Sequence, residues 1–156
     1  MKTFGFWNNK GGTGKTSLVF QTVCRYAEQH PQQKILVIDA CPQANLSELL
    51  LGGLEGSGSA NLTILQNLTP RKTIAGYFQQ RLPSPYVLPT IVPSNFISNP
   101  SAFNSSVSTN IDLMAGDALV ELQSNFLATL SNTQIPGIDT WLVVIDWLND
   151  FARTLV

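Results

Sequence analysis

The chain has 156 residues and a formal net charge of −1, and 44% of its residues are hydrophobic. This length and composition predict one globular domain with a core and exclude a wholly disordered chain. The balanced charge gives no electrostatic argument for nucleic-acid binding, and no stretch reaches the ~20 apolar residues of a membrane span. The two cysteines have neither metal-ligand nor CxxC spacing, so we expect free thiols in a reducing cytoplasm.

The first elements in chain order surround a glycine-rich loop. The apolar stretch 3–8 predicts a short buried strand, and apolar residues recur at helical spacing over 18–29. Between them stands the sequence Lys-Gly-Gly-Thr-Gly-Lys-Thr-Ser, residues 10–17. A strand, a glycine-rich turn and a helix are the context in which a Gly-Lys-Thr motif binds phosphate. The alternative is a glycine-rich turn that only links a strand to a helix.

Each residue type in this loop suits a nucleotide phosphate. Glycines allow backbone N–H groups to approach phosphate oxygens, and the helix adds its positive N-terminal end. Lys15 supplies a charge for the β- and γ-phosphates, and the Thr16 hydroxyl is predicted to bind Mg²⁺, which predicts ATP and Mg²⁺ as cofactors. The predicted nucleotide-binding residues are Lys10, Gly11, Gly12, Thr13, Gly14, Lys15, Thr16 and Ser17.

Two further apolar runs end in an aspartate. Residues 34–39 predict a buried parallel strand whose last residue, Asp39, faces the phosphate pocket from the carboxyl end of the sheet. Residues 141–146 predict a second such strand in the Walker B arrangement, with Asp146 as the carboxylate that orders Mg²⁺. Asp39 is a second candidate for the metal.

The rest of the chain predicts helices and one long connection. Helical spacing indicates helices over 61–68 and 69–81, the second with Thr69 as its N-cap. Residues 111–115 predict a strand, and the aspartate at position 117 is expected to cap the helix that follows. Residues 82–110 contain no charged side chain and five prolines. They predict an irregular surface loop, with a partner-binding segment as the alternative.

The loop resembles the deviant P-loop of the ParA/MinD family of ATPases, written Lys-Gly-Gly-x-Gly-Lys-Thr, with Lys10 as its first lysine. In that family the first lysine reaches across a homodimer to the partner's nucleotide. The resemblance therefore implies catalytic roles for Lys10, Lys15 and Asp39; a solvated surface lysine is the alternative for Lys10. The ParA-branch signature Asp-x-Asp-Pro-Gln-x-Asn is matched at Asp39, Pro42, Gln43 and Asn45.

The same resemblance implies a fold and a biological role. The expected fold is α/β, a P-loop NTPase-type domain over 1–156 with a mostly parallel sheet, helices on both faces and an apparently truncated C-terminus. The implied activity is ATP hydrolysis coupled to homodimerisation in plasmid or chromosome partitioning or cargo positioning. A ParB-type centromere-binding protein is the implied partner. The family's non-specific DNA contacts come from a later region that this sequence does not show.

Cys41 is the main departure from the family pattern. It stands where the family has a second aspartate that helps position the attacking water. A neutral thiol is a weak hydrogen-bond partner, so nucleotide binding could survive this change while turnover is lost. The sequence leaves two alternatives open, a nucleotide-binding switch without hydrolysis and an inactive truncated remnant. A GTPase is less favoured because no Asn-Lys-x-Asp motif occurs.

Overall fold

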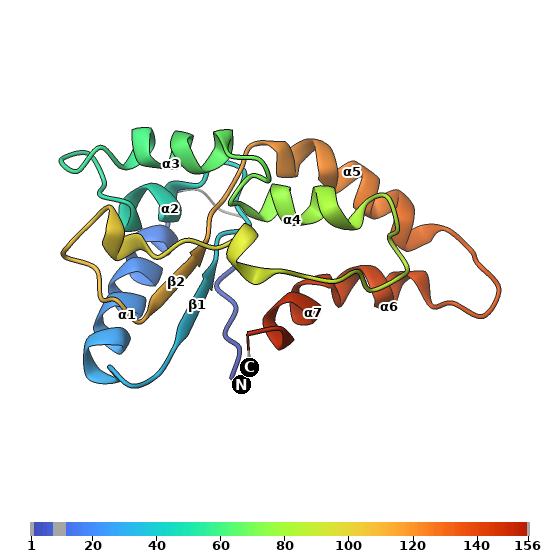
Figure 1. Ribbon diagram of the computed structural model, residues 1–156, viewed down its shortest axis with the longest axis horizontal. Coiled ribbons are helices and arrows are strands. Elements are labelled where there is room, and N and C mark those ends of the chain that lie inside the picture. Colours follow the sequence, from blue (N-terminus) through green and yellow to red (C-terminus); the bar gives the residue numbers. More distant parts are fainter. Residues whose placement is uncertain (1, 8–11, 156) are drawn as a thin grey trace.

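A two-stranded parallel sheet lies at the centre of the computed structural model, which describes residues 2–7 and 12–155. Its strands are β1 (Ile35–Ile38) and β2 (Ile111–Met114), paired in register from Ile35 with Ile111 onward (Figure 1). The runs of branched apolar residues predict both strands, and the structure confirms them. The chain therefore has an α/β fold with a small parallel sheet.

One face of the sheet is covered by three helices, α1 (Lys15–Gln29), α2 (Asn45–Leu50) and α3 (Gly58–Asn67). Alternate strand residues such as Val37 and Leu113 point into this cluster, since successive side chains of a strand face opposite sides. The predicted helices over 18–29 and 61–68 are confirmed as α1 and α3, with boundaries shifted by a few residues.

The opposite face carries a second apolar cluster with α4 (Ile74–Arg81) and α7 (Trp147–Arg153). The intervening strand residues Leu36, Ile38 and Met114 reach this side. Helices thus lie on both faces of the sheet, as the sequence predicted. The buried aromatic side chains of this cluster are Tyr77, Phe78, Phe96, Trp147 and Phe151.

The predicted N-cap of α4 is wrong by four residues. Thr73 is the cap, and its hydroxyl accepts a hydrogen bond from the backbone N–H of Gly76. Thr73 is fully buried and forms an isolated parallel bridge with Ala115, just beyond β2. The bridge at the end of the sheet therefore determines the first residue of α4. The N-cap pattern at Thr69 does not determine it.

The predicted strand over 141–146 is also wrong, because this run forms the helix α6 (Thr140–Ile145). The carboxylate of Asp139 accepts a hydrogen bond from the backbone N–H of Leu142 at 3.0 Å and caps the helix. The hydroxyl of Thr140 donates to the carbonyl oxygen of Thr133 at 2.6 Å. A short apolar run is compatible with either element, and these cap contacts favour the helix.

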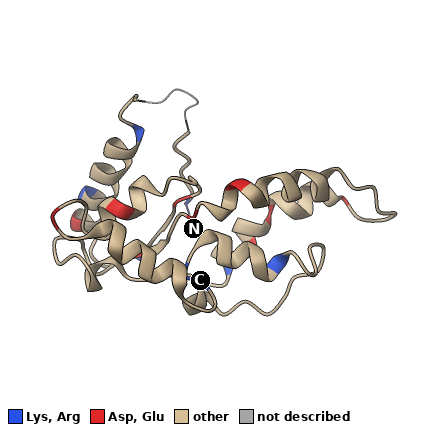
Figure 2. Ribbon diagram, turned by 90° about the horizontal axis from the view of Figure 1, so that it is seen from above, with Lys and Arg blue, Asp and Glu red and all other residues tan. Residues whose placement is uncertain are grey.

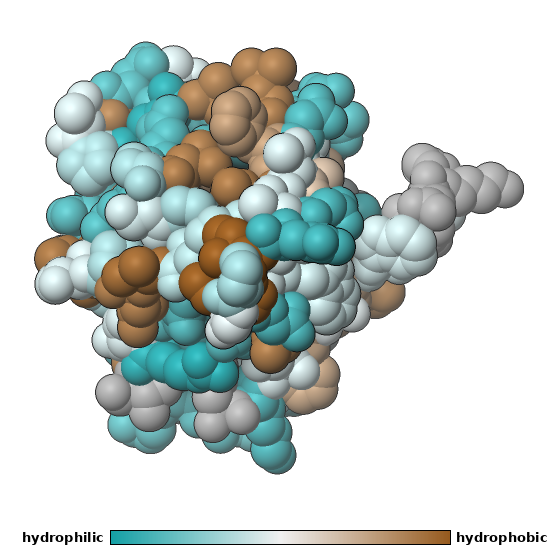
Figure 3. Space-filling view, turned by 90° about the vertical axis from the view of Figure 1, so that its right-hand side faces the viewer, coloured by the Kyte–Doolittle hydropathy of each residue, from teal (hydrophilic) through white to brown (hydrophobic). Residues whose placement is uncertain are grey.

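The helix α6 packs against α5 (Leu119–Asn132) as a hairpin that projects from the sheet (Figure 1). The outer surface of the hairpin exposes several large apolar side chains. Seen from this end, hydrophobic side chains alternate with polar ones over the surface (Figure 3). Its exposed large apolar residues are Leu122, Phe126, Ile138, Trp141, Leu142 and Ile145.

The predicted strand over 3–8 is not part of the sheet in the residues that the structure describes. Residues 3–7 have no regular secondary structure and are exposed, with Phe4 at 77% and Trp7 at 81% relative accessibility. The eighth residue lies outside the described ranges. An apolar run becomes a strand only where another backbone pairs with it, and residues 3–7 have no such pairing here.

The proline-rich stretch 82–110 contains two short 3-10 helices, η1 (Pro93–Asn95) and η2 (Pro100–Ala102). It also reaches the sheet, where Ser98 forms an antiparallel bridge with Leu113. The stretch therefore contributes to the core as well as to the surface. Its buried apolar side chains are Phe96, Pro100 and Val107.

One buried amide joins the amino end of the sheet to the end of α1. The Asn110 side-chain nitrogen donates to the carbonyl oxygens of Ala27 at 3.3 Å, His30 at 3.0 Å and Gln33 at 2.9 Å. The carbonyl oxygen of Asn110 accepts from the backbone N–H of Ile35 at 3.0 Å. This residue therefore fixes the turn between α1 and β1 against β2.

We expect Asn110→Ala to lower the free energy of unfolding by about 1–3 kcal/mol, because buried carbonyl oxygens lose their donor. Urea unfolding followed by circular dichroism measures the change. Asn125→Ala, at an exposed position of α5, is the matched control and should have little effect. Equal unfolding midpoints for Asn110→Ala and the wild type would contradict this role.

Candidate functional site

The amino end of α1 and the carboxyl ends of both strands lie at the same end of the sheet (Figure 1). This follows from the topology, since α1 returns to β1 through a short turn and β2 runs parallel to β1. Ligands of α/β proteins bind at the carboxyl ends of the strands. The predicted nucleotide-binding loop therefore lies where this fold places ligands.

Two glycines of the loop adopt a backbone conformation that disfavours other residues. Gly12 has a φ of 72° and Gly14 has a φ of 76°, both in the left-handed region. Gly14 is the N-cap of α1, and its carbonyl oxygen accepts the first helical hydrogen bond, from Leu18 at 2.9 Å. A side chain at either position costs about 1–2 kcal/mol in backbone strain. The glycines therefore permit the tight turn into the helix.

The first turn of α1 presents unpaired donors and positive charge. Its first backbone N–H groups have no partner within the helix, no side chain caps it, and no acidic residue lies in that turn. Lys15 and Thr16 are half-buried, and Ser17 is exposed beside them. A phosphate suits these donors, and the Thr16 hydroxyl is the hard oxygen ligand that Mg²⁺ prefers.

The loop itself is described only in part. Gly12, Thr13 and Gly14 are exposed, as an approach by a ligand requires. Lys10 and Gly11 lie outside the described residues. The predicted role of Lys10 toward a partner's nucleotide therefore stays a prediction.

Asp39 follows β1 and is buried. One carboxylate oxygen accepts hydrogen bonds from the backbone N–H of Ser47 at 3.0 Å and from its hydroxyl at 2.8 Å. The other oxygen accepts from the backbone N–H of Cys41 at 3.2 Å. The Asp39 carboxylate thus accepts hydrogen bonds from the protein's own donors. The sequence predicted that this carboxylate faces the phosphate pocket.

Ser47 is a residue of this region that sequence reasoning missed. Its buried hydroxyl also accepts a hydrogen bond from the backbone N–H of Gly116 at 2.9 Å. It therefore connects the end of β1 with the end of β2. The sequence signal was slight, a serine at the third position of a short helix, eight residues after Asp39.

A second buried carboxylate, Asp117, follows β2. It accepts hydrogen bonds from the side-chain Nε of Arg71 at 2.8 Å and from the hydroxyl of Thr73 at 2.9 Å. It also accepts from the backbone N–H of Leu119, the first residue of α5, at 3.0 Å, but the N-cap of that helix is Ala118, one residue after the predicted Asp117. Both aspartates at this end of the sheet are therefore committed to the protein's own donors.

Asp146 lies between α6 and α7, on no strand. Its carboxylate accepts hydrogen bonds from the side-chain amide of Asn149 at 2.7 Å and from the guanidinium of Arg153 at 2.9 Å. These contacts, with Asn149 the larger cause, hold the pKa of Asp146 below its ordinary value. The strand on which its predicted metal role depended is absent from the structure.

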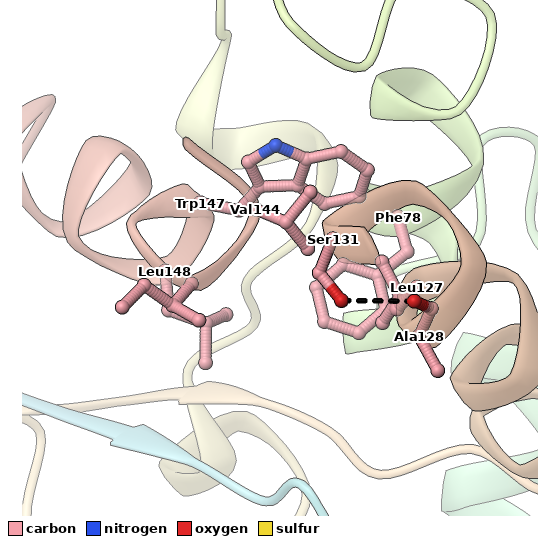
Figure 4. A pocket seen from close by; sticks show the side chains of 8 residues that line it. Phe78, Leu127, Ala128, Ser131, Val144, Trp147 and Leu148 are labelled. Atoms are coloured by element: carbon pink, nitrogen blue, oxygen red, sulfur yellow. Dashed lines mark hydrogen bonds between the residues drawn. The ribbon is translucent and has the colours of Figure 1, made fainter. Parts of the chain in front are cut away.

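An apolar hollow lies between α4, α5, α6 and α7 (Figure 4). Its volume is about 290 Å³, and the hydroxyl of Ser131 within it donates to the carbonyl oxygen of Ala128. Charged side chains are sparse over the whole ribbon (Figure 2), and none lines this hollow. It therefore lacks the groups that bind a phosphate. The lining residues are Phe78, Leu127, Ala128, Ser131, Val144, Ile145, Trp147 and Leu148.

Two absences hold for the residues that the structure describes. No helix within 2–7 and 12–155 is both long and apolar enough to cross a membrane. In the same part of the chain, no three side chains of histidine, cysteine, aspartate or glutamate gather as a metal centre.

Comparison with known proteins gives one family and one relative. Residues 1–133 match the sequence profile of a family described as AAA domain. The virulence plasmid ParA family protein pGP5-D of Chlamydia muridarum (strain MoPn / Nigg) is 42% identical over 57 residues. That match covers 36% of this chain and 21% of the relative, so it spans about one fifth of the relative's length. No solved structure matches the chain.

We expect Gly116→Ala to lower the free energy of unfolding by about 1–3 kcal/mol through overpacking. An added Cβ would lie 2.7 Å from the Cβ of Ala44 and 2.7 Å from the carbonyl oxygen of Cys41. Gly5→Ala is the control, because a Cβ there meets nothing within 4 Å. Chemical denaturation of the three proteins tests this, and a wild-type midpoint for Gly116→Ala would show that the loop moves aside freely.

Proposed function

Because the chain belongs to the family of ParA/MinD-type P-loop AAA domains, we propose that it binds Mg·ATP as a nucleotide-binding module of a partitioning ATPase. The observation that carries this proposal is the start of α1. Left-handed Gly12 and Gly14 precede a helix without a side-chain cap, whose first residues are Lys15 and Thr16. This is the arrangement of backbone and side chains that a nucleotide phosphate requires.

The first turn of α1 supplies the groups that bind the nucleotide. The N–H groups of the first helical turn bind phosphate oxygens, and the Lys15 ammonium neutralises the β- and γ-phosphates. The hydroxyl of Thr16 holds Mg²⁺. When bound, the metal would supply positive charge that offsets the negative charge of the phosphates.

The proposal extends to dimerisation and to a biological role. We infer that ATP binding brings two copies together, with Lys10 at the partner copy's nucleotide. The role is plasmid or chromosome partitioning in the cytoplasm with a ParB-type partner. The family match and the ParA family name of the chlamydial relative support this extension.

Cys41 favours a second candidate function, a switch that binds nucleotide without hydrolysing it. The thiol is half-buried, and its sulfur lies 3.5 Å from the side-chain oxygen of Gln43. A thiol orients water poorly compared with a carboxylate, so slow turnover is compatible with intact binding.

Lys15→Ala tests the proposed binding directly. We expect the affinity for Mg·ATP to fall well over tenfold, since loss of a charge-assisted phosphate contact costs about 2–5 kcal/mol. Isothermal titration calorimetry measures the affinity. Lys34→Ala is the matched control, because that exposed lysine precedes β1 at the opposite end of the sheet.

Unchanged affinity in Lys15→Ala would overturn the assignment of the loop. A wild-type chain that binds neither ATP nor GTP, with or without Mg²⁺, would favour the inactive remnant.

Cys41→Asp separates the ATPase from the switch. If position 41 is the water-side position, an added carboxylate should raise single-turnover phosphate release about tenfold or more. Cys41→Ser is the control of similar size that stays neutral. Equal release by Cys41→Asp and Cys41→Ser would show that position 41 does not act on the water.

A further inference from the structure

A single carboxylate, that of Asp39, holds the loop between β1 and α2 by hydrogen bonds. The Asp39 carboxylate accepts hydrogen bonds from the N–H of Cys41 in the loop and from the N–H and hydroxyl of Ser47 in the first turn of α2. Both side chains are buried, Asp39 at 5% and Ser47 at 0% relative accessibility. An unpaired buried carboxylate is costly, so the loop cannot leave this path without losing bonds on both sides.

The segment just after β2 restrains the same loop from a third side. The Ser47 hydroxyl accepts the N–H of Gly116 at 2.9 Å, and Ala44 packs where a side chain at position 116 would lie. Ala44 itself has a φ of 52°, an unusual conformation for a residue with a Cβ. Such a conformation persists only where surrounding contacts determine it.

This arrangement divides the loop into an inner and an outer part. A carboxylate can accept about four hydrogen bonds, and three donors already point at the Asp39 carboxylate. The side chain of Gln43 is exposed, and that of Cys41 is half-buried. The inner carboxylate therefore holds the loop, while the outer side chains are available to a ligand.

The loop also lies on the ligand side of the sheet. The helix that it leads into, α2, packs against α1, and the carboxyl end of β1 and the amino end of α1 share one end of the sheet (Figure 1). The loop is therefore close to the proposed phosphate site without forming part of the glycine-rich turn.

We propose that Asp39 and Ser47 are a positioning pair, which holds the Cys41–Gln43 turn as a wall of the nucleotide site. This inference rests on the proposed function for the identity of the ligand. Asp39 acts in it through the turn and is no metal ligand, and Ser47 acts through Asp39.

Three amide protons test the pair in the wild-type chain without any ligand. The N–H groups of Cys41, Ser47 and Gly116 donate to this pair, and those of Cys41 and Gly116 lie outside the helices and strands. We expect slow hydrogen exchange of all three by NMR. Exchange of the Cys41 and Gly116 amides at the rate of an exposed loop overturns the proposal.

Thiol chemistry gives a second test. Burial, with Glu28 as a smaller cause, raises the pKa of the Cys24 thiol, and Cys24→Ser removes this thiol from the measurement. In that background we expect Ser47→Ala to speed maleimide labelling of Cys41 about fivefold or more, because the variant loses the two hydrogen bonds of the hydroxyl, the one it donates to Asp39 and the one it accepts from Gly116. Ser47→Thr keeps a hydroxyl and should label more slowly than Ser47→Ala, and Ser59→Ala, at an exposed position of α3, should leave the rate unchanged. Equal labelling rates in Ser47→Ala and in the protein with Ser47 would overturn the positioning role of the pair.

Nucleotide titration tests whether the pair of Asp39 and Ser47 contributes to the nucleotide site. We expect Asp39→Asn and Ser47→Ala to weaken ATP binding by the same factor, about fivefold, with Mg²⁺ and with EDTA. A loss in Asp39→Asn confined to Mg²⁺ makes Asp39 a metal ligand and overturns the positioning role. Unchanged ATP affinity in both variants would show that the Cys41–Gln43 turn is not a wall of the nucleotide site. A wild-type chain that binds no nucleotide overturns the proposed function and the turn's part in it, whereas amide exchange and labelling still report on the pair itself.

Discussion

Two buried carboxylates at the carboxyl end of the sheet organise the chain around them. Asp39 gathers donors from the loop before α2, and Asp117 gathers donors from Arg71, Thr73 and the start of α5. An ionised group left without donors in this setting would cost more than most single contacts supply. The paths of the chain after β1 and after β2 are therefore coupled, and the link between them is the hydroxyl of Ser47 on the N–H of Gly116.

The parts of the fold that follow from local pattern could be predicted from the sequence. The apolar runs around β1 and β2 and the helical spacing of α1 and α3 are examples. The run 141–146 has the same branched residues but forms a helix, because Asp139 caps it and the Thr140 hydroxyl binds the end of α5. Those contacts depend on how two helices meet, which periodicity does not report.

The same distinction applies to the candidate site. The loop before α1 is a contiguous motif, so its glycines, Lys15 and Thr16 can be identified from the order of residues alone. The surroundings of Asp39 cannot, because the hydroxyl that binds it also binds an amide 69 residues away in the chain. A carboxylate at the end of a strand can face a ligand or hold a loop, and the sequence does not distinguish these. The residues that surround the carboxylate in the folded protein determine which of these two roles it has.

The hairpin of α5 and α6 bears on the order in which the molecule opens. The buried residue of α5 is a glutamine, Gln123, whose side chain donates to the carbonyl oxygen of Ala75, and the helix buries no large apolar side chain fully. Segments with few buried apolar contacts open at a lower free energy than the core. Subglobal opening should therefore begin in this hairpin, while the sheet and the first turn of α1 remain native. The molecule would then lose its projecting arm and still keep the end of the sheet that carries the glycine-rich loop.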